Sequence, residues 1–519
     1  MQGAIAAGHP LTAETGAQIL REGGNAVDAC VAAAFASWIC ESPLTGPGAG
    51  GFMLVHRARD GVTGLLDFFV AAPGSGLPGG RAAMETVDVR FDERTTQRFH
   101  IGPSSCAVPG TVAGLAEAHR RYGSLPWLEL VAPAIRLARA GVVVSGAQAY
   151  LHAILDPVLR RTGPGRLVFG ERGPIGAGGR LVMADLAATL ERLAAEGAGA
   201  FYRGEIARRI SETVVAGGGG ITEADLGQYR VVRRRPVRVP YRATEFVSNP
   251  PPSAGGLLIA FALRVHDTLG SLGVERSSEA IAILAEVMRE AARARDGSLA
   301  RRLRSGGAAA WLLCDSAVEA AAERARAGVG EPALEACGLP STTHVSVIDG
   351  AGNAASLSSS TGCGSGVVVP GTGIHLNNML GEPDLNPGGS LPAGRRLTSM
   401  MAPSLVLEAG RPRLVLGSAG SERLRGAILQ VVVNVITHGL SVREAIAAPR
   451  AHLDGDVLHL EGGTDPAAAD RLAELGYELV RWPERNLFFG GVSAVGRQTG
   501  GGLEAEGDLR RGGAGVVVA

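Results

Sequence analysis

One short segment of the chain carries the residues best suited to nucleophilic chemistry. Ser341, Thr342 and Thr343 open a run of β-branched and apolar residues that ends in an Asp-Gly turn, which is the pattern of a strand. Downstream, the glycine-rich run 416–421 lies between a predicted strand and a predicted helix. Backbone N–H groups in such a run can stabilise negative charge that develops on an oxygen atom. A hydroxyl group and an oxyanion-binding loop together would suit attack on a carbonyl carbon.

The same residues also have simple structural interpretations. Thr342 and Thr343 can be β-branched residues that merely begin a strand. A catalytic role for this pair is favoured over a structural one because of its position. The two residues lie where a helix-rich part of the chain meets a strand-rich part, directly after the Gly- and Pro-containing segment 326–341. For His344 a backbone hydrogen bond is favoured over catalysis, and for Cys363 simple packing is favoured. The remaining histidines lack the spacing of a metal site, so neither a metal nor a cofactor is expected.

The composition excludes several classes of protein. The chain has 519 residues with 50 basic and 50 acidic side chains, and every basic one is arginine. A chain without lysine has no Walker A lysine and forms no lysine Schiff base, which excludes P-loop NTPases, kinases and pyridoxal enzymes. A net charge of zero leaves no surplus of cations for phosphates, so nucleic acid is not expected as a partner.

A helix-rich first part and a strand-rich second part must position the candidate residues. Alanine-rich and amphipathic stretches predict helices, and short β-branched stretches predict strands. In residues 1–325 the predicted helices are 11–22, 25–40, a pair within 110–141, 183–216 and several within 255–325, and the predicted strands are 52–57, 63–69 and 228–248. In residues 342–519 the predicted strands are 343–360, 366–370, 404–408, 412–416 and parts of 476–519, with a helix over 422–451.

The beginning of the chain predicts no membrane or secretory targeting. It lacks the basic region and the apolar stretch of a secretory signal, and no window of about 18 residues is apolar and free of charge and glycine. We therefore expect a cytoplasmic location for the chain as given, or a periplasmic or secreted one if a signal was removed. No membrane partner is expected.

The segment Thr342–Asp349 resembles the start of the small subunit of γ-glutamyltransferases, the threonine branch of the N-terminal-nucleophile hydrolases. The resemblance continues in the same order along nearly the whole chain, which chance does not explain. The other matching segments are His9-Pro10, Gly23–Ala29, Gly50–Met53, Pro109–Gly114, Phe201–Gly204, Pro250–Gly256, Leu376–Asn378, Ala448–Arg450 and Asp508–Gly513.

The resemblance implies an α/β (α+β) fold, a four-layer αββα sandwich made as an inactive precursor that cleaves itself between Ser341 and Thr342. A helix-rich large subunit, 1–341 with a flexible segment 326–341 before the cut, and a strand-rich small subunit, 342–519, would stay together as one intertwined heterodimer. The freed α-amine of Thr342 has a reference pKa of about 7.7–8.0, so it can accept the proton of its own hydroxyl group.

The resemblance also implies supporting catalytic residues. Gly420 and Ser421 match the positions whose backbone N–H groups form the oxyanion hole of the family. Relatives usually have two glycines there, and Ser421 has a narrower choice of backbone conformations than glycine. Ser360 matches a threonine whose hydroxyl group supports the nucleophile, and serine keeps that hydroxyl group.

The implied substrate-binding residues match the family pattern in part. Thr398 and Ser399 match a hydroxyl pair that contacts the α-carboxylate of a γ-glutamyl donor. Glu382 matches the acidic residue that meets the α-amine of the donor, with Asp384 as the alternative. These residues imply that part of the γ-glutamyl site is kept.

The main departure concerns the donor carboxylate. Phe69 stands where relatives have the arginine that binds this carboxylate, and Gly362 and Met379 replace two polar residues. Loss of one charged contact of about 3 kcal/mol is expected to weaken the use of glutathione roughly a hundredfold. Arg395 or Arg396 would have to reach in from another side to restore the contact.

Two functions remain open at this point. One is an active threonine amidohydrolase or acyltransferase that moves a γ-glutamyl or related acyl group from a small-molecule amide to water or an amine. Within this class the donor could also be a different amide, as in cephalosporin acylases or oxamate amidohydrolase. The other is a catalytically dead scaffold. The expected protein partner is the second fragment of the same chain, with a dimer of the heterodimers as a further possibility.

Overall fold

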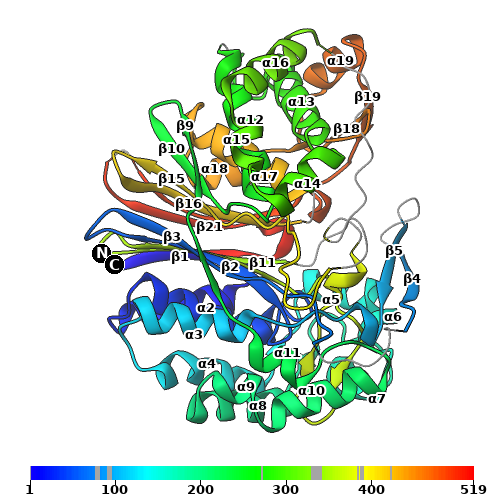
Figure 1. The fold of residues 1–519 in the computed structure, drawn as a ribbon. Coiled ribbons are helices and arrows are strands. Elements are labelled where there is room, and N and C mark those ends of the chain that lie inside the picture. Colours follow the sequence, from blue (N-terminus) through cyan, green and yellow to red (C-terminus); the bar gives the residue numbers. More distant parts are fainter. Residues whose placement is uncertain are drawn as a thin grey trace.

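Two β-sheets packed face to face form the centre of the molecule, and helices cover the outer face of each sheet (Figure 1). The structure is a computed structural model that describes residues 2–75, 82–90, 96–270, 273–328, 342–382, 385, 391–420, 423–498 and 500–519. The four layers confirm the expected αββα sandwich.

Each sheet combines strands from both sides of the segment 329–341. Among the described residues, one sheet has seven strands in the order β22 (Ala514–Val518), β1 (Gly3–Ala7), β11 (Thr343–Asp349), β12 (Ala354–Ser360), β2 (Gly50–Arg57), β3 (Val62–Phe68) and β8 (Val232–Arg234). The other sheet has six strands in the order β21 (Leu503–Gly507), β20 (Gly491–Arg497), β16 (Arg411–Ala419), β15 (Ser404–Glu408), β10 (Thr244–Ser248) and β9 (Val237–Tyr241). The two parts of the chain are therefore intertwined, which makes one folding unit of both.

The outer helices belong to two groups. The seven-stranded sheet is covered by α1 (Pro10–Arg21), α2 (Ala26–Cys40) and α3 (Thr111–Tyr122), with α4 (Trp127–Ala140) packed on α2 and α8 (Ala184–Glu196) packed on α4. The six-stranded sheet is covered by α12 (Gly255–Leu269), α17 (Arg423–Ile436) and α18 (Val442–Ala447), with α13 (Ser278–Arg293) and α16 (Asp315–Arg326) packed on α12.

Smaller elements complete the described chain. The remaining α-helices are α5 (Gly146–Ile154), α6 (Asp156–Leu159), α7 (Gly163–Phe169), α9 (Gly199–Tyr202), α10 (Glu205–Ala216), α11 (Glu223–Gln228), α14 (Gly297–Ser305), α15 (Ala308–Leu312) and α19 (Pro466–Glu474). The remaining strands are β4 (Glu85–Arg90), β5 (Thr96–Ile101), β6 (Val142–Val143), β7 (Arg180–Leu181), β13 (Val368–Val369), β14 (Ile374–His375), β17 (Ala451–Asp454), β18 (Val457–Leu460) and β19 (Glu478–Arg481). Short 3-10 turns are η1 (Pro103–Ser105), η2 (Met379–Gly381), η4 (Leu487–Phe489) and η5 (Leu509–Arg511).

Apolar side chains fill each of the three spaces between the layers. Val345 and Val347 of β11 face the helices on the seven-stranded sheet, whereas Ile348 faces the six-stranded sheet. This alternation follows from the two-residue period of a strand. Every residue of α2 is buried, because α2 lies between the sheet and α4. Its many alanines allow close packing on all sides.

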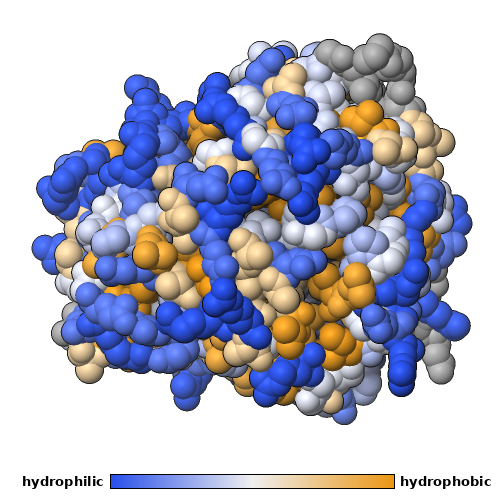
Figure 2. All heavy atoms as spheres, turned by 90° about the horizontal axis from the view of Figure 1, so that it is seen from below, coloured by the Kyte–Doolittle hydropathy of each residue, from blue (hydrophilic) through white to orange (hydrophobic). Residues whose placement is uncertain are grey.

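The outer surface around the helices is mixed in polarity. Seen from below, apolar side chains lie singly and in small groups among hydrophilic ones (Figure 2). Exposed apolar residues on the lower helical layer include Leu128 and Leu167, and scattered exposure of this kind is normal. Among the described residues, no helix has the length and apolarity needed to cross a bilayer.

Most predicted elements are confirmed, and two predicted helices are divided. Helices 11–22 and 25–40 correspond to α1 and α2, and strands 52–57 and 63–69 correspond to β2 and β3. The single helix predicted over 422–451 is wrong, because Gly439 adopts φ 74° and Ser441 caps a new helix, α18. The stretch 183–216 likewise forms α8, α9 and α10, with breaks at glycines.

Candidate active site

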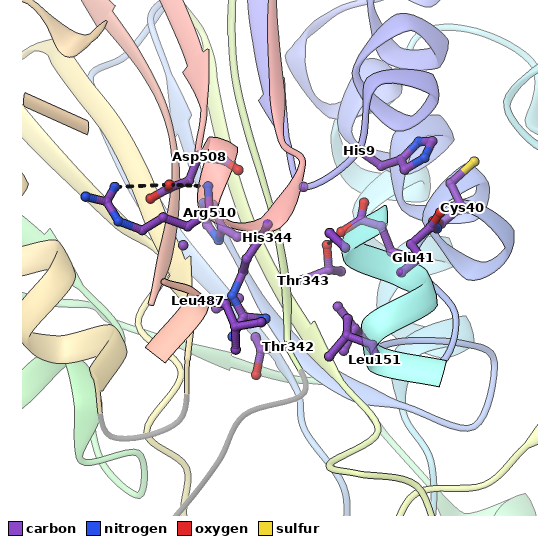
Figure 3. Close-up of a pocket in the computed structure, with 18 of the residues that line it drawn as sticks. His9, Cys40, Glu41, Leu151, Thr342, Thr343, His344, Leu487, Asp508 and Arg510 are labelled. Carbon is purple, nitrogen blue, oxygen red and sulfur yellow. Dashed lines mark hydrogen bonds and ion pairs between the residues drawn. The ribbon is translucent and has the colours of Figure 1, made fainter. Parts of the chain in front are cut away.

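Thr342 lies directly before β11, an inner strand of the seven-stranded sheet, and 5% of it is exposed. Thr342 lines a pocket together with the next two residues of the chain (Figure 3). Other walls come from the β1–α1 turn, the end of α2, α5, and the segments around η4 and η5, and they include Gly8, His9, Glu41, Leu151, Leu487, Asp508 and Arg511. The fold therefore gathers residues from distant parts of the chain around the predicted nucleophile.

Ser360 lies across from Thr342 on the neighbouring strand. Strands β11 and β12 are antiparallel and pair Thr343 with Ser359, so the same register continued by one residue pairs Thr342 with Ser360. Opposed residues of such a pair project to the same face, with Cβ atoms about 4.5–5.5 Å apart. The Ser360 hydroxyl accepts a hydrogen bond of 2.9 Å from the N–H of Gly362. This geometry suits a hydroxyl group that supports the nucleophile.

Gly420 forms the turn between β16 and α17. Its φ is 140°, and a Cβ atom there would lie 2.9 Å from the Cα of Gly490, so glycine is required for this close approach. Ala419, the preceding residue, lines the same pocket as Thr342. The turn leads into a helix, where the first N–H groups have no partner within the helix. Ser421 lies outside the described residues.

Two charged pocket residues were not predicted from the sequence. Burial raises the pKa of Glu41 to about 7, although hydrogen bonds from Thr343 and Thr12 and the charge of Arg511 oppose this rise. Burial lowers the pKa of Arg511 to about 10, and its Nε and Nη2 have no hydrogen-bond partner in the described part of the chain. Glu41 lies in no motif. Arg511 could have been proposed from the sequence, because it is one of two adjacent arginines in the segment Asp508–Gly513 that matches the family.

A buried ion-pair network supports the wall that carries Arg511. Asp508 Oδ2 accepts hydrogen bonds from Arg450 Nη2 at 2.7 Å and from the N–H of Val492 at 3.0 Å. Arg510 bridges Asp508 and Glu461. Burial alone would raise the pKa of Asp508, but the two arginines lower it below its usual value. Loss of one partner in such a network costs about 3–5 kcal/mol, so these side chains hold the wall in place.

Glu382 lies near the same end of β12 as Ser360. Its Oε1 accepts a hydrogen bond of 3.1 Å from Asn378 Nδ2, and a Cβ atom on Gly362 would lie 3.4 Å from that oxygen. The structure therefore brings this carboxylate close to Gly362, whose N–H is bonded to the Ser360 hydroxyl. Asp384, the alternative residue, lies outside the described residues.

Thr398 is connected to Glu382 through the backbone of Leu385, whereas the hydroxyl of Ser399 bonds within its own segment. Thr398 Oγ1 donates a hydrogen bond of 2.8 Å to the carbonyl of Leu385, and the N–H of Leu385 donates one of 3.1 Å to the carbonyl of Glu382. The Ser399 hydroxyl accepts a hydrogen bond of 3.1 Å from the N–H of Met401. The contact of this hydroxyl pair with a substrate carboxylate stays a prediction.

Phe69 packs in the apolar core between the two sheets. Its ring stacks on Phe52 with 5.5 Å between the ring centroids, and 1% of the residue is exposed. Met379 and Leu380 belong to the same apolar cluster. Since these neighbours enclose its side chain, Phe69 would affect a substrate through the packing of this cluster and not as an exposed wall.

The two arginines considered as replacements for the lost carboxylate contact have different surroundings. Arg396 Nε lies 3.3 Å from Asp67 Oδ1, and its guanidinium carbon lies 4.5 Å from the centre of the Tyr229 ring. Arg395 is exposed and donates a hydrogen bond of 3.1 Å to the carbonyl of Arg304. Arg395 and Arg396 both line a cavity together with Thr398, so they differ in the carboxylate that engages Arg396. Of the two, Arg395 is therefore the residue better placed to receive an anion.

Phe69→Arg is expected to destabilise the fold. A guanidinium group at this position would enter the apolar core between the sheets, where it would lack both water and a partner. We expect a loss of about 3 kcal/mol or more in the free energy of unfolding, measured by denaturant or thermal unfolding. Phe69→Leu keeps an apolar side chain of similar bulk and serves as the control, with an expected loss below about 2 kcal/mol. An arginine variant as stable as the wild type would contradict this packing.

Comparisons with known proteins relate the chain to one family. The model of the family described as "Gamma-glutamyltranspeptidase" matches residues 12–518. The chain is 34% identical over 536 residues to the acylase ACY 1 proenzyme of Pseudomonas sp. (strain SE83), with 100% of this chain and 94% of that protein covered. It is 33% identical to the glutathione hydrolase proenzyme of Pseudomonas aeruginosa, with 99% and 94% covered. The crystal structure of cephalosporin acylase from Bacillus halodurans superposes with a TM-score of 0.83 at 26% identity, with 99% and 95% covered.

Proposed function

The chain belongs to the gamma-glutamyltranspeptidase family, and on this basis we propose that it is a self-cleaving threonine amidohydrolase or acyltransferase. One observation carries the proposal. Thr342 and Ser360 lie opposite each other on adjacent strands, and Thr342 lines one pocket together with Ala419, the residue before the Gly420 turn. These are the nucleophile, its supporting hydroxyl group and the oxyanion donors that acyl transfer needs.

Maturation would create the catalytic base. In the precursor, the nitrogen of Thr342 belongs to the peptide bond with Ser341 and cannot accept a proton. Hydrolysis of this bond frees an α-amine on the same residue as the hydroxyl nucleophile. Two relatives are named proenzymes, which supports such a step. Fragments 1–341 and 342–519 would stay associated, because both sheets combine strands from the two parts.

The reaction would proceed in two steps through an acyl-enzyme. The neutral amine takes the proton of the Thr342 hydroxyl while its oxygen attacks the carbonyl carbon of the amide. The N–H groups at the Gly420 turn stabilise the resulting oxyanion, and the amine half of the substrate leaves with a proton. Water or an amine then attacks the ester, which releases the acyl group and regenerates Thr342.

The surroundings of the site favour a donor other than a γ-glutamyl amide. The position of the carboxylate-binding arginine holds Phe69, and Met379 lies in the same apolar cluster. Arg396 is engaged by Asp67 and Tyr229. In the pocket of Thr342, the buried Nε and Nη2 atoms of Arg511 have no hydrogen-bond partner in the described chain. We therefore favour an amide whose acyl half lacks the α-carboxylate and which carries an anionic group elsewhere that can meet Arg511.

A matched pair of chromogenic donors tests this preference. The 4-nitroanilides of γ-glutamate and of 4-aminobutyrate differ only in the α-carboxylate. We expect kcat/KM for the γ-glutamyl compound to be no higher than that for the 4-aminobutyryl compound, whereas a carboxylate clamp of about 3 kcal/mol would favour the γ-glutamyl compound roughly a hundredfold.

The variant Arg395→Gln tests whether Arg395 is the cause if the wild type prefers the γ-glutamyl donor. If the wild type prefers the γ-glutamyl donor and the variant loses that preference, Arg395 binds the carboxylate and the chain acts as a γ-glutamyl enzyme. If neither donor nor other amides are cleaved by a processed protein, the amidohydrolase proposal fails and the scaffold interpretation replaces it.

A further inference from the structure

Glu41 is a buried carboxylate next to the nucleophile that the reaction scheme above does not use. It follows the last residue of α2 and lines the pocket of Thr342 (Figure 3). Its Oε1 accepts a hydrogen bond of 2.9 Å from the Thr12 hydroxyl, and its Oε2 accepts one from the Thr343 hydroxyl. A Cβ atom on Gly8 would lie 2.3 Å from Oε2, so the absence of a side chain at Gly8 makes room for the carboxylate.

The hydrogen bond to Thr343 reaches the nucleophile through the backbone. Successive side chains of a strand point to opposite faces, so the side chain of Thr343 points away from that of Thr342. Thr343 turns toward the helical layer, where Glu41 holds its hydroxyl group. The Cα atoms of consecutive residues are 3.8 Å apart across a rigid peptide group. The hydrogen bond that holds Thr343 therefore also restricts the position of Thr342. After cleavage, no peptide bond on the N-terminal side of Thr342 would hold it in place.

Glu41 has no ion-pair partner in the described part of the chain, and Arg511 is the cation that lowers its pKa through its charge. The other titratable side chains that line this pocket are His9, Cys40, His344, Asp508 and Arg510, and cleavage would add the α-amine of Thr342. Burial lowers the pKa of His9 to about 4 and that of His344 to about 3, and it raises the pKa of Cys40. Arg450 and Arg510 keep Asp508 charged, and Arg510 has a raised pKa. Between pH 6 and 8 the groups expected to change charge are thus Glu41 and the Thr342 amine.

We propose that Glu41 is the positioning residue of the nucleophile, acting through the Thr343 hydroxyl group, and that its charge tunes the amine of Thr342. The proposal rests on the assignment of Thr342 as the N-terminal nucleophile. The hydrogen bond fixes the geometry of attack, and the negative charge favours the protonated amine. An ionised Glu41 therefore makes the amine a stronger base that becomes neutral at a higher pH.

Two variants test the positioning role. Glu41→Ala and Thr343→Val each remove one partner of the hydrogen bond, and each is expected to lower kcat about tenfold to a hundredfold with KM changed less than about threefold. The double variant is expected to be no worse than the more impaired single variant, because both changes remove the same interaction. Additive losses, or an unchanged kcat in Thr343→Val, would show that Glu41 does not act through Thr343.

Glu41→Gln tests the charge separately from the position. The amide oxygen still accepts the Thr343 hydrogen bond, so kcat at high pH is expected to recover to within about threefold of the wild type. Without the negative charge, the amine pKa falls, and the acid limb of kcat/KM is expected to move to lower pH by roughly half to one unit. An unmoved or upward-shifted limb would contradict the electrostatic part of the proposal.

Glu286→Gln is the matched control. Glu286 is a buried glutamate of α13 that accepts hydrogen bonds from Tyr477 at 2.8 Å and Arg289 at 3.1 Å. Its variant is expected to lower thermal stability without moving the pH limb, as a purely structural glutamate would. A processed, active wild type whose kcat survives in Glu41→Ala overturns this proposal alone. A wild type that never splits overturns the assignment of Thr342 and this proposal together.

Discussion

Thr342→Ala is expected to leave the chain uncut and to lower activity at least about ten-thousandfold, a loss typical of removing a catalytic nucleophile. The alanine has no hydroxyl group to attack either the Ser341–Thr342 peptide bond or a substrate carbonyl. The rest of the proposed site, including Ser360 and the Gly420 turn, would remain, so substrate affinity is expected to survive in part.

Denaturing electrophoresis and N-terminal sequencing check this result. The wild type is expected to yield fragments 1–341 and 342–519 that co-elute under native conditions, with Thr342 as the new N-terminus. Thr342→Ser keeps a hydroxyl group and serves as the control, with slower but measurable cleavage and activity. A new N-terminus at Thr343, or cleavage that persists in Thr342→Ala, would contradict the assignment of the nucleophile.

Gly420→Ala is expected to lower kcat about a hundredfold to a thousandfold, the usual cost of losing an oxyanion donor. The φ of 140° disfavours any residue with a Cβ atom, and the added carbon would lie 2.9 Å from the backbone of Gly490. The turn would have to shift, and the proposed contact of its N–H groups with the oxyanion would be lost. KM is expected to change less than kcat, because the oxyanion exists only in the transition state and intermediate.

Gly410→Ala is a matched control on the same strand. Gly410 precedes the other end of β16 with φ 76°, and a Cβ atom there would meet no heavy atom within 4 Å. This variant carries a comparable backbone strain of about 1–2 kcal/mol far from the pocket. It is expected to lower the melting temperature while kcat stays within about twofold of the wild type. Equal losses of kcat in both variants would indicate a general effect of stability and not loss of the oxyanion hole.

Local patterns in the sequence predicted most of the elements and the family. Helices α1 and α2 and strands β2 and β3 were predicted close to their observed bounds, because alanine-rich and apolar runs of this kind are properties of neighbouring residues. Motifs in the same order along nearly the whole chain indicated the family that the comparisons then established. The split of 422–451 into α17 and α18 was missed, since a single glycine within a helical pattern is often tolerated.

Tertiary structure alone decided the surroundings of the candidate site. Glu41 and Thr343 are 302 positions apart, and no spacing rule connects them. The packing of the two sheets against each other decides the contacts of two further residues. Phe69 packs on Phe52 and is not an exposed wall of a substrate pocket, and Arg396 meets the carboxylate of Asp67. Local periodicity tells which face of an element is apolar, but only the packing of elements from distant parts of the chain determines which side chains meet and which charges are left facing a pocket.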